Sequence, residues 1–157
     1  MRRKDREVTD LEKIYQIMDD CDCCRLGFYD DGEVYIVPLN FGYNKADDDE
    51  LVLYFHGAKA GRKVDLITKG GMVGFEMDRD YKLNEADIAC NYSARFQSII
   101  GNGEVSFVED VVEKEFGLQR IMYQNTKKDD WEFNDAMLQA VCVFKVIVKK
   151  LSCKVHE

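Results

Sequence analysis

Short apolar runs separated by turn residues are the feature that most limits how this chain can fold. The runs are rich in β-branched and aromatic side chains, which favour strands, and they cover 24–29, 34–41, 51–55, 72–77, 92–108 and 140–148. Asp30-Asp31-Gly32 separates the first two runs and suits the positive φ angles of a tight hairpin. Because few crossover helices connect the runs, their order predicts a mainly antiparallel sheet with flanking helices, closed into a barrel.

Helical signals lie between these runs. The expected helices cover 10–20, a short segment closed by Gly70-Gly71, 110–123 and a turn after Asn134. Thr9 and Glu12 have the spacing of a capping box, with Thr9 as the N-cap of the first helix. Two polar stretches, 43–50 and 78–91, are expected to be a loop and a charged excursion. The length of 157 residues fits a single domain over 1–157.

Proline and glycine interrupt two of the runs. Pro38 cannot donate to a strand ladder, which favours an edge strand or a bulge. Gly101 and Gly103 lie within a long extended run and indicate a bend or bulge. This Gly-Asn-Gly does not match a dinucleotide-binding fingerprint, because Ser106 stands at the third small position and the chain continues as a strand.

The charge and the hydropathy pattern exclude several function classes. A net charge of −8 argues against a general nucleic-acid binder, which needs clustered Lys and Arg. No apolar run approaches the ~18 residues of a membrane span. The charged segment 1–7 has no apolar core behind it, so no signal peptide is expected. These features predict a cytoplasmic protein.

The six cysteines do not form a metal-binding pattern. They are Cys21, Cys23, Cys24, Cys90, Cys142 and Cys153. No second Cys/His pair follows the cluster at 21–24, and a reducing compartment disfavours disulfides. We therefore expect Cys24 and Cys142 to be buried strand residues and Cys23 to be exposed and oxidisable.

The segment from His56 to Lys63 is the strongest local signal for a binding site. A strand ends there, the chain turns at Gly57, and Lys59, Arg62 and Lys63 gather around the start of a helix. Helix N-terminal amides and nearby cations attract anions, and a basic cluster is unusual in a chain this acidic. The alternative is a solvated helix face, with His56 as an ordinary loop histidine.

Three other residues have both a structural and a functional interpretation. Pro38 either ends strand pairing or leaves backbone groups free to face a ligand. Ser98 is either a core hydroxyl or a polar group presented from an apolar strand. Trp131, the only tryptophan, either covers the core or forms an aromatic wall for a planar ligand.

Four segments together resemble a known family. They are Cys24-Arg25-Leu26-Gly27, Tyr35-Ile36-Val37-Pro38-Leu39-Asn40-Phe41-Gly42-Tyr43, Leu53-Tyr54-Phe55-His56-Gly57-Ala58 with Gly61-Arg62-Lys63, and Ser98-Ile99-Ile100-Gly101-Asn102-Gly103. In this order they resemble the FMN-binding split-barrel proteins, specifically the nitroimidazole-resistance-type branch related to pyridoxamine 5′-phosphate oxidase. The resemblance extends over roughly residues 1–150.

The resemblance implies a fold, a cofactor and a set of site residues. The fold is a six-stranded antiparallel split β-barrel of Greek-key type, which forms a homodimer with one FMN in each of two grooves between subunits. The implied cofactor-binding residues are Val37, Pro38, Leu39 and Asn40 along the isoalloxazine ring, His56 beside the flavin, Arg62 and Lys63 at the phosphate, Ser98 and Ile99 beneath the cofactor, and Trp131 toward the partner's flavin. His56 is also the candidate to orient a substrate or donate a proton.

The resemblance also implies an activity. We expect an FMN-dependent oxidoreductase that passes electrons from NADH or NADPH to a small planar acceptor such as a nitroaromatic. One alternative is a non-catalytic flavin- or haem-binding module with His56 as the haem ligand. Another is a pyridoxamine phosphate oxidase-like enzyme, although the pyridoxal-recognition motif has no visible counterpart here. A third is a barrel with a vestigial groove that serves protein interaction.

Overall fold

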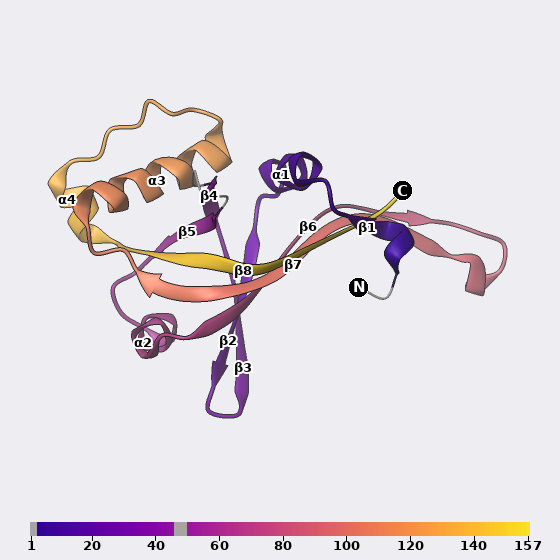
Figure 1. The fold of residues 1–157 in the computed structure, drawn as a ribbon, viewed down its shortest axis with the longest axis horizontal. Coiled ribbons are helices and arrows are strands. Elements are labelled where there is room, and N and C mark those ends of the chain that lie inside the picture. Colours follow the sequence, from indigo (N-terminus) through magenta and orange to yellow (C-terminus); the bar gives the residue numbers. More distant parts are fainter. Residues whose placement is uncertain (1–2, 46–49) are drawn as a thin grey trace.

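A computed structural model describes residues 3–45 and 50–157, which form one antiparallel sheet with flanking helices (Figure 1). The strands are β1 (Glu7–Val8), β2 (Cys24–Asp30), β3 (Glu33–Leu39), β4 (Phe41–Lys45), β5 (Leu51–Gly57), β6 (Met72–Asn84), β7 (Ser93–Phe107) and β8 (Cys142–His156). The helices are α1 (Leu11–Asp19), α2 (Arg62–Lys69), α3 (Val111–Thr126) and α4 (Asp135–Ala140), with 3-10 turns at Lys4–Arg6 and Ala89–Asn91. The mainly β, antiparallel prediction is confirmed.

The fold is consistent with the predicted split barrel, but the sheet is open and has more than the six strands expected. Among the described residues it has eight strands in the order β3-β2-β6-β7-β8-β5-β4, with β1 paired to β8. The two edge strands, β3 and β4, are separated in sequence only by Asn40. The sheet therefore curls until its edges approach at Asn40, but no ladder joins them there. Pro38 lies on edge strand β3, as its missing N–H predicted.

The long strands β7 and β8 carry the predicted bulge. Their pairing shifts register between Asn102 and Gly103. A Cβ atom on Gly103 would lie 2.3 Å from the Ile147 carbonyl oxygen, so only glycine permits this close approach. The glycines in the sequence therefore marked the irregularity correctly.

The helix starts agree with the sequence except at α1. Its N-cap is Asp10, whose carboxylate accepts from the Glu12 N–H at 3.0 Å, and not Thr9. The Asp10 carbonyl already accepts the first helical hydrogen bond, from Ile14, which defines Asp10 as the cap. The helices expected over 110–123 and after Asn134 are confirmed and begin at capped residues: Asp110 accepts from Glu113 N–H at 2.8 Å and Asn134 from Met137 N–H at 3.0 Å.

Two predicted non-strand segments are partly strand. The acidic loop expected at 43–50 begins inside β4, because residues up to Lys45 pair with β5; residues 46–49 lie outside the described chain. The charged excursion at 78–91 is extended up to Asn84, where β6 still pairs with β7 after a register shift between Arg79 and Lys82. The backbone ladder holds these strands whatever the polarity of their side chains.

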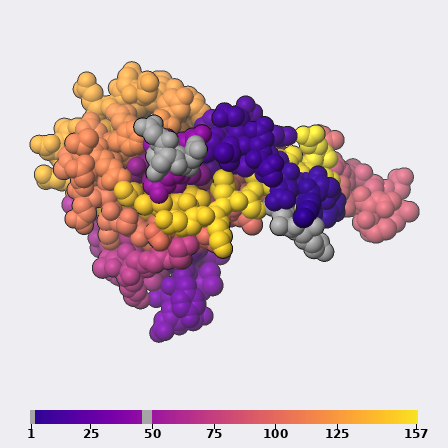
Figure 2. Space-filling model, in the orientation of Figure 1, coloured from indigo at the N-terminus to yellow at the C-terminus, as the bar shows by residue number. Residues whose placement is uncertain are grey.

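The main core lies inside the curl of the sheet. Phe41, Phe55 and Phe144 are fully buried there, together with residues from α1 and α2. A second cluster packs beneath α3 and α4 on the other side of β5 and β8. Two parts of the chain project from this body, the β2–β3 hairpin and the distal end of β6–β7 (Figures 1 and 2). No helix of the described residues is long and apolar enough to cross a membrane.

The six cysteines are free thiols in various surroundings. Cys24 is buried on β2 as expected, with Cys21 and Cys153, and burial raises the pKa of the Cys21 thiol to about 12. Cys142 is only half-buried, and its Sγ donates to the Ala58 carbonyl at 3.1 Å. Cys23 is also half-buried, so it is less exposed than we predicted.

Candidate functional site

The start of α2 is a helix N-terminus without a side-chain cap. Strand β5 ends at Gly57, where His56 and Gly57 pair with Val143 and Cys142 of β8. The chain then turns to Gly61, which has φ 118° and provides no side-chain hydrogen bond to the first turn. The N–H groups of the first helical turn have no partners within the helix, and they lie at the positive end of the helix dipole. Such an uncapped start can accept an anion.

Lys63 presents an unpartnered cation at this helix start. Among the described residues its ammonium group has no hydrogen bond and no ion pair; it lies 5.5 Å from the centre of the Phe144 ring. A Cβ atom on Gly57 would lie 2.8 Å from the Lys63 Nζ, so the absence of a side chain at Gly57 makes room for the ammonium group. The Lys63 charge is therefore available to a ligand.

His56 lies next to Lys63 and is held neutral. Its imidazole reaches the surface, but the protein atoms around it lower its pKa below the ordinary 6.5, and the positive charge of Lys63 lowers the pKa further. The neutral ring is the main form at pH 7, and it can both donate and accept a hydrogen bond. The structure thus brings His56 and Lys63 close enough for the charge of Lys63 to act on the imidazole.

Arg62, although adjacent to Lys63, has a different environment. Its Nε donates to Asp30 Oδ2 at 2.9 Å and its Nη2 to Glu33 Oε2 at 2.7 Å. Its guanidinium group also lies 4.9 Å from the centre of the Tyr35 ring. Hydrogen bonds from Arg62 and then Lys69 lower the pKa of Asp30. The expected pair of phosphate-binding cations thus divides into one free and one engaged side chain.

The residues expected along the flavin ring lie on and just after edge strand β3. Val37 and Leu39 are half-buried on the inward face of β3 and pack against the main core, whereas Pro38 is exposed. The Asn40 side chain is exposed, and its Nδ2 donates to Asn125 Oδ1 of α3 at 2.8 Å. This contact ties the junction of β3 and β4 to α3.

The other predicted residues are more distant from α2. On β7, Ile99 is fully buried in the main core, so Ser98 is the side chain of this pair that reaches the surface. Trp131 is 38% exposed, and its indole Nε1 donates to Thr126 Oγ1 at 3.2 Å. The segment between α3 and α4 lies across the sheet from α2 (Figure 1). One chain therefore brings His56, Arg62 and Lys63 together but not Trp131.

Four residues that shape this region were not predicted from the sequence as site residues. Gly57 and Phe144 define the position of the Lys63 ammonium group, and Asp30 and Glu33 engage Arg62. Gly57 and Asp30 belong to motifs with a clear sequence signal, the His56–Lys63 segment and the hairpin turn. Phe144 carried no local signal, since an aromatic residue within an apolar strand is ordinary.

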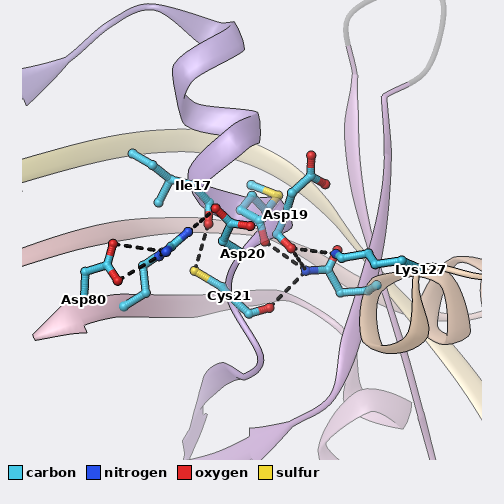
Figure 3. A network of polar contacts seen from close by, with 9 residues as sticks. Ile17, Asp19, Asp20, Cys21, Asp80 and Lys127 are labelled. Carbon is cyan, nitrogen blue, oxygen red and sulfur yellow. Dashed lines mark hydrogen bonds and ion pairs between the residues drawn. The ribbon is translucent and has the colours of Figure 1, made fainter.

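A second polar cluster lies at the C-terminal end of α1 (Figure 3). The buried amide of Gln124 donates to the carbonyls of Met18 and Cys21, both at 2.9 Å, and Lys127 donates to the Asp19 carbonyl at 2.7 Å. These donors, from the last turn of α3 and its C-cap, add hydrogen bonds to carbonyls at the end of α1, where helical partners run out. This cluster holds α1 to α3.

Comparison with protein families identifies the class. Residues 10–155 match the family model described as pyridoxamine 5′-phosphate oxidase. The chain belongs to this family of flavin-binding proteins, which confirms the resemblance found in the sequence.

Solved structures support the same assignment. A candidate 5-nitroimidazole antibiotic resistance protein from Bacteroides thetaiotaomicron is 32% identical, with a TM-score of 0.79 over 95% of this chain and 86% of that chain. The flavocytochrome Anf3 from Azotobacter vinelandii has a TM-score of 0.81 at 20% identity, covering 100% of this chain and 72% of that one. The FAD and heme binding protein from Mycobacterium smegmatis has a TM-score of 0.80 at 15% identity, covering 97% and 74%. Among proteins with curated descriptions, the comparison found no match.

Proposed function

We propose that the protein is a cytoplasmic, FMN-dependent oxidoreductase that transfers electrons from NADH or NADPH to a small planar acceptor such as a nitroaromatic. The observation that carries the proposal is the unpartnered Lys63 at the uncapped start of α2, beside a neutral His56. A phosphate group fits these donors, because helix amides and an ammonium group form charge-assisted hydrogen bonds with an anion. The similarity to the candidate nitroimidazole resistance protein supports the acceptor class.

The residues of the chain have separate roles in this proposal. Lys63 and the first-turn amides of α2 hold the phosphate, and the inward side chains Val37 and Leu39 provide apolar surface for the ring. The flavin, when bound, supplies the electron transfer itself. The neutral His56 offers one donor and one acceptor, so it can orient a planar acceptor and donate a hydrogen bond to a nitro or carbonyl oxygen.

The proposal includes a homodimer in which the second chain completes the site. In one chain, a hollow beside α2 is lined by Lys59 and Val64 but not by His56 or Lys63, and it measures 260 Å³, below the ~300 Å³ at which small-molecule pockets begin. The outer face of the sheet carries exposed Val34 and Ile36 beside a 380 Å³ hollow with Gly27 and Gly74 among its lining residues. Sedimentation should give a dimer, and Ile36→Glu should convert it to a monomer with weakened FMN binding. If the mass of this variant is unchanged, this face is not the dimer interface.

FMN titration tests the cofactor. FMN should bind with a perturbed visible spectrum and stabilise the fold by about 2.7 kcal/mol at a hundredfold excess over the Kd. Riboflavin, which lacks the phosphate, should bind more weakly and serves as the matched control. Absence of both spectral change and thermal stabilisation would reject the proposal. Steady-state assays with NADH or NADPH and a nitroaromatic then test the activity.

A second candidate is a flavin- or haem-binding module without turnover. The observation in its favour is the similarity of fold to the flavocytochrome and to the FAD and heme binding protein. Tight FMN binding without reduction of any nitroaromatic would favour this candidate. For haem, a Soret band that depends on His56 would be the expected sign, and a band that survives His56→Ala would exclude His56 as the ligand.

A further inference from the structure

The contacts of Arg62 suggest a role different from that of Lys63. We propose that Arg62 is a positioning residue that clamps the β2–β3 hairpin to α2, and that recognition of the flavin phosphate falls to Lys63 and not to Arg62. The proposal rests on the proposed flavin site. It reassigns one of the two cations that the family resemblance places at the phosphate.

Two of the three guanidinium nitrogens of Arg62, and its charge, are already engaged. Its Nε and Nη2 bind two different carboxylates, Asp30 and Glu33, which flank the hairpin turn. Lys69, at the other end of α2, donates to the second oxygen of Asp30 at 3.2 Å. Two cations and two carboxylates cancel in this cluster, so an approaching phosphate dianion would meet no net attraction there.

Backbone pairing with the rest of the sheet holds only the base of the hairpin. Strand β2 pairs with β6 only over Arg25–Gly27, and β3 is an edge strand. Beyond these residues the two strands pair with each other and project from the sheet (Figures 1 and 2). Phe28 is buried in the main core and Tyr35 packs against it, so the exposed tip beyond them is the part left for Arg62 to orient. A two-stranded hairpin is marginal by itself. The carboxylates at its tip are therefore well placed to determine its orientation through Arg62.

The clamp connects directly to β3, the strand whose residues are expected along the flavin ring. The guanidinium group of Arg62 stacks on Tyr35, and Tyr35, Val37 and Leu39 occupy alternate positions on the inward face of β3. Arg62 and Lys63 are adjacent at the start of α2. One helix start thus orients the surface for the ring through Arg62 and holds the phosphate through Lys63.

The two roles make opposite predictions for FMN and riboflavin. Lys63→Ala should weaken FMN binding about tenfold to a hundredfold and leave riboflavin binding unchanged. The ratio of the riboflavin Kd to the FMN Kd should therefore fall by the same factor. Arg62→Ala should weaken both flavins by the same factor, about threefold to tenfold, so that the ratio stays within about twofold of the wild type. A large fall of this Kd ratio in Arg62→Ala would overturn the proposal.

Glu33→Gln gives a test of opposite sign. If Arg62 positions the hairpin, losing its carboxylate partner should weaken both flavins about twofold to fivefold. If Arg62 instead binds phosphate, removing the competing carboxylate should tighten FMN, and this result would overturn the proposal. Arg62→Lys keeps the charge but loses the two-pronged geometry, so it should behave like Arg62→Ala.

Hydrogen exchange without flavin separates this proposal from the proposed function. In the flavin-free protein, Arg62→Ala and Glu33→Gln should speed amide exchange in residues 28–37, whereas Lys63→Ala should not. Unchanged amide exchange in both variants would overturn the proposal that Arg62 holds the hairpin. If the wild type binds neither flavin but the clamp variants loosen the hairpin, the proposed function fails and the clamp stands. The pairs are exposed and contribute little to global stability, so the variants should fold.

Discussion

The start of α2 and the end of α1 are both helix termini with charged neighbours, but their polar groups are partnered differently. At the end of α1, Gln124 and Lys127 of the α3 region donate to main-chain carbonyls, and Arg79 pairs with Asp20 and Asp80. At the start of α2, no side chain caps the helix and Lys63 has no polar partner among the described residues. Polar groups that are satisfied within the chain hold the fold together, whereas those left unsatisfied at a helix start are available to a ligand.

Lys63→Ala is the change with the largest expected effect on this contrast. Loss of a hydrogen bond to a charged group costs about 1.5–3 kcal/mol, so FMN affinity should fall by that amount in a fluorescence titration. Lys59→Ala removes an exposed cation of the preceding turn and should leave FMN affinity within about twofold of the wild type. Equal losses in both variants would mean that only the general positive charge matters.

Gln124→Leu should affect stability and not binding. Gln124 is 6% exposed, and its amide satisfies carbonyls at the end of α1. Loss of these buried hydrogen bonds costs about 1–3 kcal/mol, measurable by urea unfolding. The matched control is Gln139→Leu, an exposed glutamine on α4, which should unfold like the wild type. A large loss of FMN affinity with unchanged stability would contradict the comparison.

Gly57→Ala should weaken FMN binding about threefold to tenfold, because the new methyl group displaces the Lys63 ammonium group. Stability should change little, since the clash involves the flexible end of a side chain. A double-mutant cycle provides the control: in the Lys63→Ala background, Gly57→Ala should have no further effect. A persisting loss in that background would assign Gly57 another role.

His56 should titrate below its ordinary pKa of 6.5, and Lys63→Ala should raise that pKa because one of its two causes is removed. At pH values between the unfolded-state pKa of 6.5 and the lower folded-state pKa, the unfolded chain binds more protons at His56 than the folded chain does. The contribution of His56 to the free energy of unfolding therefore falls as the pH falls through this window. An NMR titration of the imidazole measures the shift. Lys59→Ala is the control, and an identical pKa in both variants would exclude Lys63 as a cause.

Much of the fold follows from local sequence signals. The hairpin turn at Asp30-Asp31-Gly32, the edge position of Pro38 and the bulge at Gly103 rest on backbone preferences that proline, aspartate and glycine express locally. The caps Asp110 and Asn134 were also predictable, since capping involves residues only three apart. The ends of β6 and β8 were not, because their charged extensions become strands only through pairing with distant partners.

The sequence by itself determined the class of fold, the family and the presence of a basic helix start beside His56. Only the tertiary structure decided how the cations there are used. Arg62 and Lys63 are equivalent in a local pattern, yet the chain brings Asp30 and Glu33 to Arg62 and leaves Lys63 over the Phe144 ring. The physical reason is that an ion pair depends on distance in space, and the carboxylates that neutralise Arg62 lie on a hairpin about thirty residues away in the chain.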